Sequence, residues 1–175
     1  MELQTGDILL VSGRGKLAKA IQKFQKKQDE RAGKWNHSAM IYNAASGQYV
    51  CEASYLHDYR LKAGVVFNPI ADYLEGDNDL MIMQPHETIP SISFEKKYFH
   101  YAGTPYEYKN LLIEQPIRIL FNKWIGSKKH SDKRMVCHEF VMTVYWEITG
   151  MFPNYYKANI ADIYHNPYFT KKQIK

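Results

Sequence analysis

Residues 36–54 read NHSAMIYNAASGQYVCEAS, and this stretch decides how the chain is expected to fold. The segments His37–Tyr42 and Tyr49–Ser54 have the composition of strands, and Asn43–Gln48 between them carries Asn, Ser and Gly, which are common in turns. The stretch therefore predicts a β-hairpin. Its two strands carry a histidine, a cysteine and a glutamate, all residue types that can do chemistry.

Further strands are expected on both sides of this hairpin. Ile8–Val11 follows the turn-forming pair Gly6-Asp7 and is apolar throughout, as in a buried strand. Val65–Phe67 and Leu80–Met83 are two more short strand candidates. Together these segments predict a small mixed or antiparallel sheet.

Helices are expected at three places. Residues from Lys16 onward place apolar side chains at helical spacing with lysines between them, and Phe94–Tyr101 is a second helix candidate. The clearest helix starts near Cys137, and its apolar positions follow the spacing i, i+3, i+4, i+7, i+8, i+11: Cys137, Phe140, Val141, Val144, Tyr145 and Ile148. Gly150 and Pro153 are expected to end it, whereas residues 106–125 receive no assignment.

The composition indicates one globular α+β domain spanning residues 1–175. Hydrophobic residues make up 45% and charged residues 23%, which disfavours both disorder and a coiled coil. No repeat and no Pro/Gly/Ser-rich stretch suggests a domain boundary.

The net charge of +5 comes largely from lysines between residues 16 and 34 and from short patches nearer the C-terminus. An anionic partner is compatible with this charge, but a small lysine excess is usually a solvated surface, so nucleic-acid binding is not expected. The sequence starts without the pattern of a signal peptide and contains no apolar run long enough to span a bilayer. A chain with its export signal removed would look the same, so the compartment stays open. The oligomeric state also stays open.

No cofactor is expected. The two cysteines, Cys51 and Cys137, form no CxxC pair, and no His and Cys cluster has the spacing of a zinc site. Neither a phosphate-binding GxxxxGK nor a dinucleotide-binding GxGxxG occurs.

Cys137 is the candidate nucleophile because a helix N-terminus lowers the pKa of a thiol. His37, fixed at the start of a strand, is the candidate general base. Glu52 is the candidate third member, provided that the hairpin register sends its side chain to the same face as His37. Each residue also has a structural reading: a core cysteine, a hydrogen-bonded histidine near a strand end, and a solvent-facing glutamate.

Cys51 is expected to point into the opposite layer as a core residue. The remaining histidines are expected at the surface. His138, although adjacent to Cys137, is turned by roughly 100° around the helix. The others fall in segments that mostly have loop character: His57, His86, His100, His130 and His165.

The order of these segments resembles the YiiX-like branch of the permuted NlpC-type, papain-like cysteine hydrolases, which are relatives of lecithin retinol acyltransferase. In that branch the histidine strand precedes the cysteine helix. The resemblance rests on six stretches in this order: residues 3–10, 36–42, 50–53, 103–108, 136–141 and 160–164.

The resemblance implies a circularly permuted papain-like fold, with a small antiparallel sheet or barrel packed against helices. It also implies acyl transfer, with Cys137 as nucleophile, His37 as base and Glu52 as the third member. Two features depart from the family pattern. His138 stands where a small residue is common after the cysteine, and residues 110–132 match nothing in the family.

Three functions follow as expectations. The first is hydrolysis of amide bonds in peptides or cell-wall fragments, through a thioester acyl-enzyme. The second is a lipid acyl hydrolase or acyltransferase in peripheral contact with a membrane, since the apolar basic stretch Leu111–Trp124 would suit an acyl chain. The third is a non-catalytic module that binds an anionic partner through the basic helix at residues 16–27.

Overall fold

A computed structural model describes residues 2–55, 63–108, 134–155 and 159–175. The strands are β1 (Ile8–Ser12), β2 (His37–Ala44), β3 (Gly47–Ser54), β4 (Gly64–Pro69), β5 (Asp79–Pro85) and β6 (Phe169–Gln173). The α-helices are α1 (Lys16–Gln25), α2 (Ala71–Glu75), α3 (Ser91–Tyr101), α5 (Cys137–Thr149) and α6 (Ile160–Tyr164), with a short 3₁₀ turn, η1 (Ala32–Lys34). The predicted α+β class is confirmed.

All six strands form one sheet in the order β4-β3-β2-β1-β5-β6, and every pairing is antiparallel. The predicted hairpin is present as β2 and β3, but its turn is shorter than expected because Ala44 already pairs with Gly47. The sheet is open rather than a closed barrel, with β4 and β6 at its edges. Every strand expected from the sequence belongs to it.

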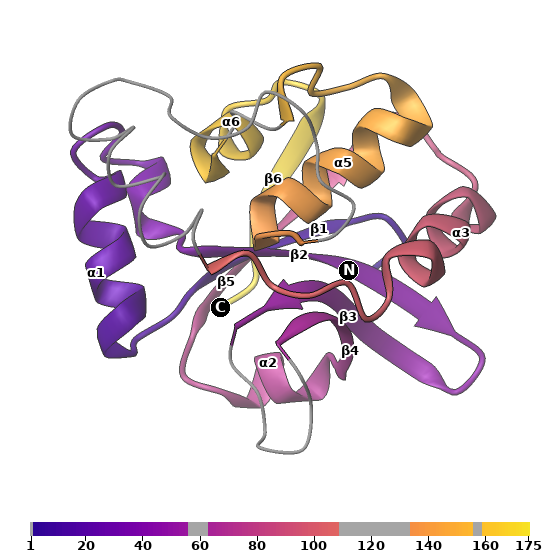
Figure 1. The fold of residues 1–175 in the computed structure, drawn as a ribbon, viewed down its shortest axis with the longest axis horizontal. Coiled ribbons are helices and arrows are strands. Elements are labelled where there is room, and N and C mark those ends of the chain that lie inside the picture. The colour runs from indigo at the N-terminus through magenta and orange to yellow at the C-terminus, as the bar shows by residue number, and fades with distance from the viewer. Residues whose placement is uncertain (1, 56–62, 109–133, 156–158) are drawn as a thin grey trace.

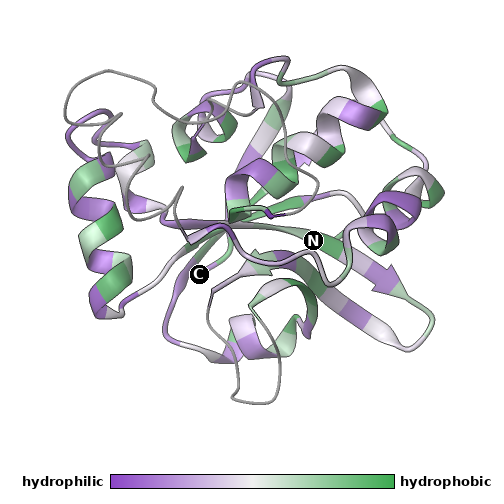
Figure 2. Cartoon of the chain, viewed as in Figure 1, coloured by the Kyte–Doolittle hydropathy of each residue, from purple (hydrophilic) through white to green (hydrophobic). Residues whose placement is uncertain are grey.

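Helix α5 covers one face of the sheet (Figure 1), and the main hydrophobic core lies between the two. Met40, Cys51 and Ala53 of the sheet are fully buried in this core together with Phe140 and Val141 of α5. The helical stripe predicted from the apolar spacing therefore faces the sheet. Figure 2 shows the hydrophobic residues concentrated on the strands and on the helix segments that face them.

The opposite face of the sheet buries a second, smaller cluster that includes Leu9, Ile41 and Val50. Ile70, which follows β4, and Ile174, which follows β6, both pack into this cluster. Residues that follow each of the two edge strands therefore contribute to one set of buried contacts. Helix α2 lies on this side, away from α5 (Figure 1).

Two hydroxyl groups tie the helices to the sheet region. Tyr145 of α5 donates a hydrogen bond of 2.6 Å to the carbonyl of Gly6, and Tyr98 of α3 donates one of 3.2 Å to the carbonyl of Ile41. Gly6 has a φ of +101°, and a Cβ atom there would lie 2.4 Å from the Phe94 ring. The turn predicted at Gly6 therefore requires glycine both for its backbone conformation and for space.

Three elements were not predicted: α2, α6 and β6. Each is only five residues long, and four of the five residues of β6 are exposed. Five residues are too few to show a clear hydrophobic periodicity, and α2 and β6 are also largely exposed. Among the described residues, no helix is both long enough and apolar enough to cross a membrane.

Candidate active site

The strand register brings His37 and Glu52 to one face of the sheet. Met40 is paired with Cys51, so Ala39 lies across from Glu52 and His37 is two residues further along the same face. His37 Nε2 is in hydrogen-bonding contact with Glu52 Oε2. The sequence left the register of the hairpin open. The structure has the register that places His37 and Glu52 on the same face of the sheet.

Cys137 is the first residue of α5, which is capped by Val136 in an extended conformation. It is 4% exposed, and its thiol lies close enough to His37 and His138 for both side chains to lower its pKa. It is therefore buried, but among polar partners and not in a purely apolar pocket. The first backbone N–H groups of α5 have no acceptor within the helix, so they leave partial positive charge beside the thiol.

Charge coupling makes Cys137 and His37 an ion pair. Burial by itself raises the pKa of the Cys137 thiol, but the charge of His37 and hydrogen bonds to His138 and His37 hold that pKa well below its ordinary value. Burial lowers the pKa of His37, but Glu52 and then Cys137 raise it to about 10. Both shifts favour the thiolate of Cys137 next to the imidazolium of His37.

Glu52 is 2% exposed and remains ionised. Burial raises its pKa, but the charge of His37 and hydrogen bonds from His37, Tyr73 and Asn68 lower it overall. Asn68 Nδ2 donates to Glu52 Oε1 at 2.7 Å, and the Tyr73 hydroxyl donates to the same oxygen. Sequence reasoning missed both residues, because neither belongs to a motif and both reach Glu52 only through the fold.

His138 corrects one expectation. It was predicted at the surface, but it is 6% exposed and its side chain is hydrogen bonded to Cys137. The side chains of α5 are buried on every face from Cys137 to Tyr145, so a turn of 100° around this helix does not lead to solvent. His86, His100 and His165 are exposed as predicted, while His57 and His130 lie outside the described residues.

Cys51 differs sharply from Cys137. It is fully buried in the core beneath α5, as predicted, and burial together with the negative charge of Glu52 raises the pKa of its thiol well above the ordinary value. The surroundings of the two cysteines therefore shift their thiol pKa values in opposite directions, downward for Cys137 and upward for Cys51.

A cavity of about 340 Å³ adjoins the site. His37, Glu52 and Tyr55 line it, and Tyr55 lies close enough to Cys137 for the thiolate to raise the pKa of its hydroxyl, in addition to burial. Much of the remaining lining is polar: Arg14, Asn36, Ser54, Asn68, Asp72 and Asn78. The cavity thus offers hydrogen-bonding groups beside the reactive pair.

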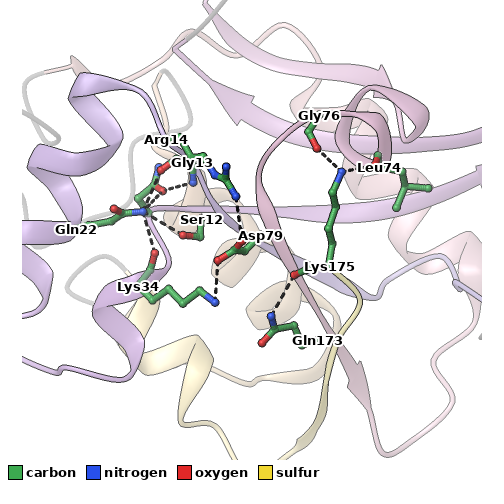
Figure 3. A network of polar contacts seen from close by, with 11 residues as sticks. Ser12, Gly13, Arg14, Gln22, Lys34, Leu74, Gly76, Asp79, Gln173 and Lys175 are labelled. Carbon is green, nitrogen blue, oxygen red and sulfur yellow. Dashed lines mark hydrogen bonds and ion pairs between the residues drawn. The ribbon is translucent and has the colours of Figure 1, made fainter.

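One wall of this cavity is the loop between β1 and α1, which Gln22 holds in place. The Gln22 side-chain amide lies within hydrogen-bonding distance of Ser12 Oγ, the carbonyls of Gly13 and Lys34, and Asn36 Oδ1, at 3.0 to 3.2 Å. Figure 3 shows these contacts converging on one amide nitrogen. Asn36 Oδ1 also accepts from the backbone N–H of Gly13 at 2.7 Å, so the residue before His37 is fixed to the loop.

Among the described residues, no group of three or more His, Cys, Asp and Glu side chains is arranged to hold a metal ion. His37 explains why its own cluster does not qualify. Its Nε2 is engaged by Glu52, and its imidazolium form, which the charges of Glu52 and Cys137 favour, has no lone pair to offer a metal.

Comparisons with known proteins bear on the fold. No protein-family model and no curated protein matches the sequence. Among solved structures, the metalloprotein YiiX from Escherichia coli O157:H7 is similar with a TM-score of 0.64 and 18% sequence identity, and the alignment covers 98% of this chain and 97% of that chain. The chain therefore has a YiiX-like fold over nearly its whole length.

Proposed function

We propose that the chain is a cysteine-dependent hydrolase of amide bonds with the segment order of a circularly permuted papain-like enzyme. In this proposal Cys137 is the nucleophile, His37 the general base and acid, and Glu52 the residue that orients His37. One observation carries it: the His37 imidazole lies between the Glu52 carboxylate and the Cys137 thiol at the N-terminus of a helix. This is the arrangement that activates a thiol for acyl transfer.

The reaction follows from the charges in the resting site. The Cys137 thiolate attacks the carbonyl carbon of the amide, and backbone N–H groups in the first turn of α5 stabilise the resulting oxyanion. As the C–N bond breaks, the imidazolium of His37 gives its proton to the departing amine, which leaves a thioester on Cys137. Neutral His37 then takes a proton from water, whose oxygen attacks the thioester and releases a carboxylic acid and the thiolate.

Glu52 supports both proton transfers without losing its own charge. Its carboxylate fixes the orientation of the imidazole and stabilises the imidazolium form through the contact between Oε2 and Nε2. Because Glu52 is buried and its pKa is lowered, this negative charge is present throughout the neutral range.

The cavity carries groups that can bind a peptide-like substrate. Asn36, Asn68 and Asp72 offer hydrogen bonds to a peptide, although the exposed surface of the lining is more apolar than polar. Peptides and cell-wall fragments fit this chemistry. Flotation with anionic vesicles tests the lipid alternative, since binding to vesicles would favour an acyl hydrolase or acyltransferase at a membrane.

YiiX is a metalloprotein, so a metal needs separate consideration here. The described residues do not fit one, because Glu52 engages Nε2 of His37 and no group of three or more His, Cys, Asp and Glu side chains among them is arranged to hold a metal ion. The mechanism therefore contains no step that involves a metal.

Thiol reactivity tests the proposal. We expect iodoacetamide at neutral pH to alkylate Cys137 much faster than Cys51, with each site followed by peptide mapping and mass spectrometry. His37→Ala should abolish the difference, because it removes the positive charge that stabilises the thiolate. Equal and slow alkylation of both cysteines in the wild-type protein would point instead to a non-catalytic binding module.

A further inference from the structure

Glu52 is held by more than His37. The side chain of this buried residue uses Oε2 for His37, and Oε1 accepts from Asn68 Nδ2 and from the Tyr73 hydroxyl. Asn68 lies on the neighbouring strand β4, opposite Val50, and so on the same face of the sheet as Glu52. Both carboxylate oxygens are therefore occupied by donors.

Tyr73 reaches Glu52 from a different element. It is the only residue of α2 that is not exposed, and its ring packs against the second hydrophobic cluster. The short helix thus meets the rest of the molecule mainly through the side chain that binds Glu52.

The last residue of the sequence anchors α2 at its other end. Lys175 Nζ donates to the carbonyl of Leu74 at 2.7 Å and to the carbonyl of Gly76, where the helix ends. Figure 3 shows this ammonium group between the two carbonyls. Ile174 next to it packs into the same cluster as Tyr73, so the segment after β6 and α2 support each other.

We propose that Tyr73 is a positioning residue for the proposed hydrolase: together with Asn68, its hydroxyl keeps the Glu52 carboxylate ionised and directed at His37. This inference rests on the proposed function. A buried carboxylate is costly unless donors replace its lost hydration, and two neutral donors on one oxygen supply that replacement without competing for His37. Among the described residues, Asn68 and Tyr73 both donate to Oε1, which leaves Oε2 to His37.

The consequence is a dependence of thiol reactivity on Tyr73. Without the hydroxyl, the charged form of Glu52 loses a hydrogen bond, so the pKa of Glu52 rises. Glu52 then takes up a proton at a higher pH than in the wild type, and the imidazolium of His37 loses its counterion. Because His37 then gives up its proton more easily, the thiolate of Cys137 loses the positive charge that stabilises it. The acidic limb of the Cys137 reactivity profile should therefore move to higher pH.

The test measures the rate of Cys137 alkylation by iodoacetamide as a function of pH in full-length protein. We expect Tyr73→Phe to shift the acidic limb upward by about one pH unit, the effect of losing one hydrogen bond to a charged group. Asn68→Leu should shift it in the same direction. Tyr49→Phe is the matched control, because it removes an exposed hydroxyl that is hydrogen bonded to Ser46 and not to Glu52, and its profile should match the wild type.

The possible results separate this proposal from the one on which it rests. If wild-type Cys137 reacts rapidly but the Tyr73→Phe and Asn68→Leu profiles both superimpose on it, the positioning role is overturned and the proposed function stands. If wild-type Cys137 reacts no faster than Cys51, both are overturned. Melting temperatures of all variants distinguish a shifted profile from loss of folded protein, since a merely structural role would change the melting temperature and leave the limb in place.

Discussion

Replacement of Glu52 by Gln removes the charge behind the reactive pair while keeping the shape of the side chain. The pKa of His37 is held at about 10, against an ordinary value of 6.5, although burial acts in the opposite direction. Glu52 is the largest contribution that raises it. Without this charge, burial remains and the pKa of His37 should fall to its ordinary value or below.

The size of the effect follows from that shift. The difference of 10 − 6.5 = 3.5 in the pKa of His37 corresponds to about 5 kcal/mol, a net value in which Glu52 and Cys137 together outweigh the opposing cost of burial. At pH 7.5 most His37 would then be neutral, and Cys137 would revert toward a thiol. We expect the alkylation rate of Cys137 to fall at least tenfold, and by up to about a thousandfold.

The assay is iodoacetamide alkylation at pH 7.5 with mass-spectrometric quantification, and Glu147→Gln is the control. Glu147 lies on the same helix as Cys137, but its carboxylate contacts Tyr101 and Lys97 instead of the site. We expect this control to react like the wild type. If Glu52→Gln also kept the wild-type rate, Glu52 would not stabilise the pair and the reasoning would be refuted.

Three further predictions concern stability. His37, with its raised pKa, contributes stability that is lost as pH rises above 6.5, whereas Cys137, with its lowered pKa, contributes stability that is lost as pH falls below 9.0. Between pH 6.5 and 9.0 the two pH dependences cancel. The difference in unfolding free energy between the wild type and a double Cys137→Ser, His37→Gln variant, measured by urea titration, should therefore be constant in this range and shrink at lower and higher pH. A steady change with pH across the whole range would contradict the ion pair. Cys51→Ser places a hydroxyl in the apolar core and should cost about 1–3 kcal/mol by denaturant titration. It should leave Cys137 alkylation unchanged, and a large loss of reactivity would show that the two cysteines are coupled. Gly6→Ala forces a Cβ atom toward Phe94 at a positive φ and should lower stability by about 2 kcal/mol or more in the same titration, so an unchanged midpoint would argue against the close approach.

His138 shows where reasoning along one helix fails. Angular position around α5 separates it from the apolar stripe, and an isolated amphipathic helix would place it in water. In the fold this segment is buried on all sides, so the residue after Cys137 becomes a second imidazole partner of the thiol. The high overall hydrophobicity of α5 was the feature of the sequence that indicated burial on all of its faces.

The sequence by itself determined the elements with strong local patterns. The apolar spacing after Cys137 predicted α5, the two strand-like segments around Asn43–Gln48 predicted the hairpin, and the chain order of His37, Glu52 and Cys137 suggested one site. The helix and the hairpin could be predicted because hydrophobic periodicity and turn residues act over a few positions.

Only the tertiary structure decided which side chains meet. The register of β2 and β3 directs His37 and Glu52 to the same face, and a slip of one residue would separate them. Asn68 and Tyr73 reach Glu52 because β4 pairs with β3 and α2 packs beyond it. Such contacts depend on the packing of elements far apart in sequence, and no local pattern encodes the distance between them.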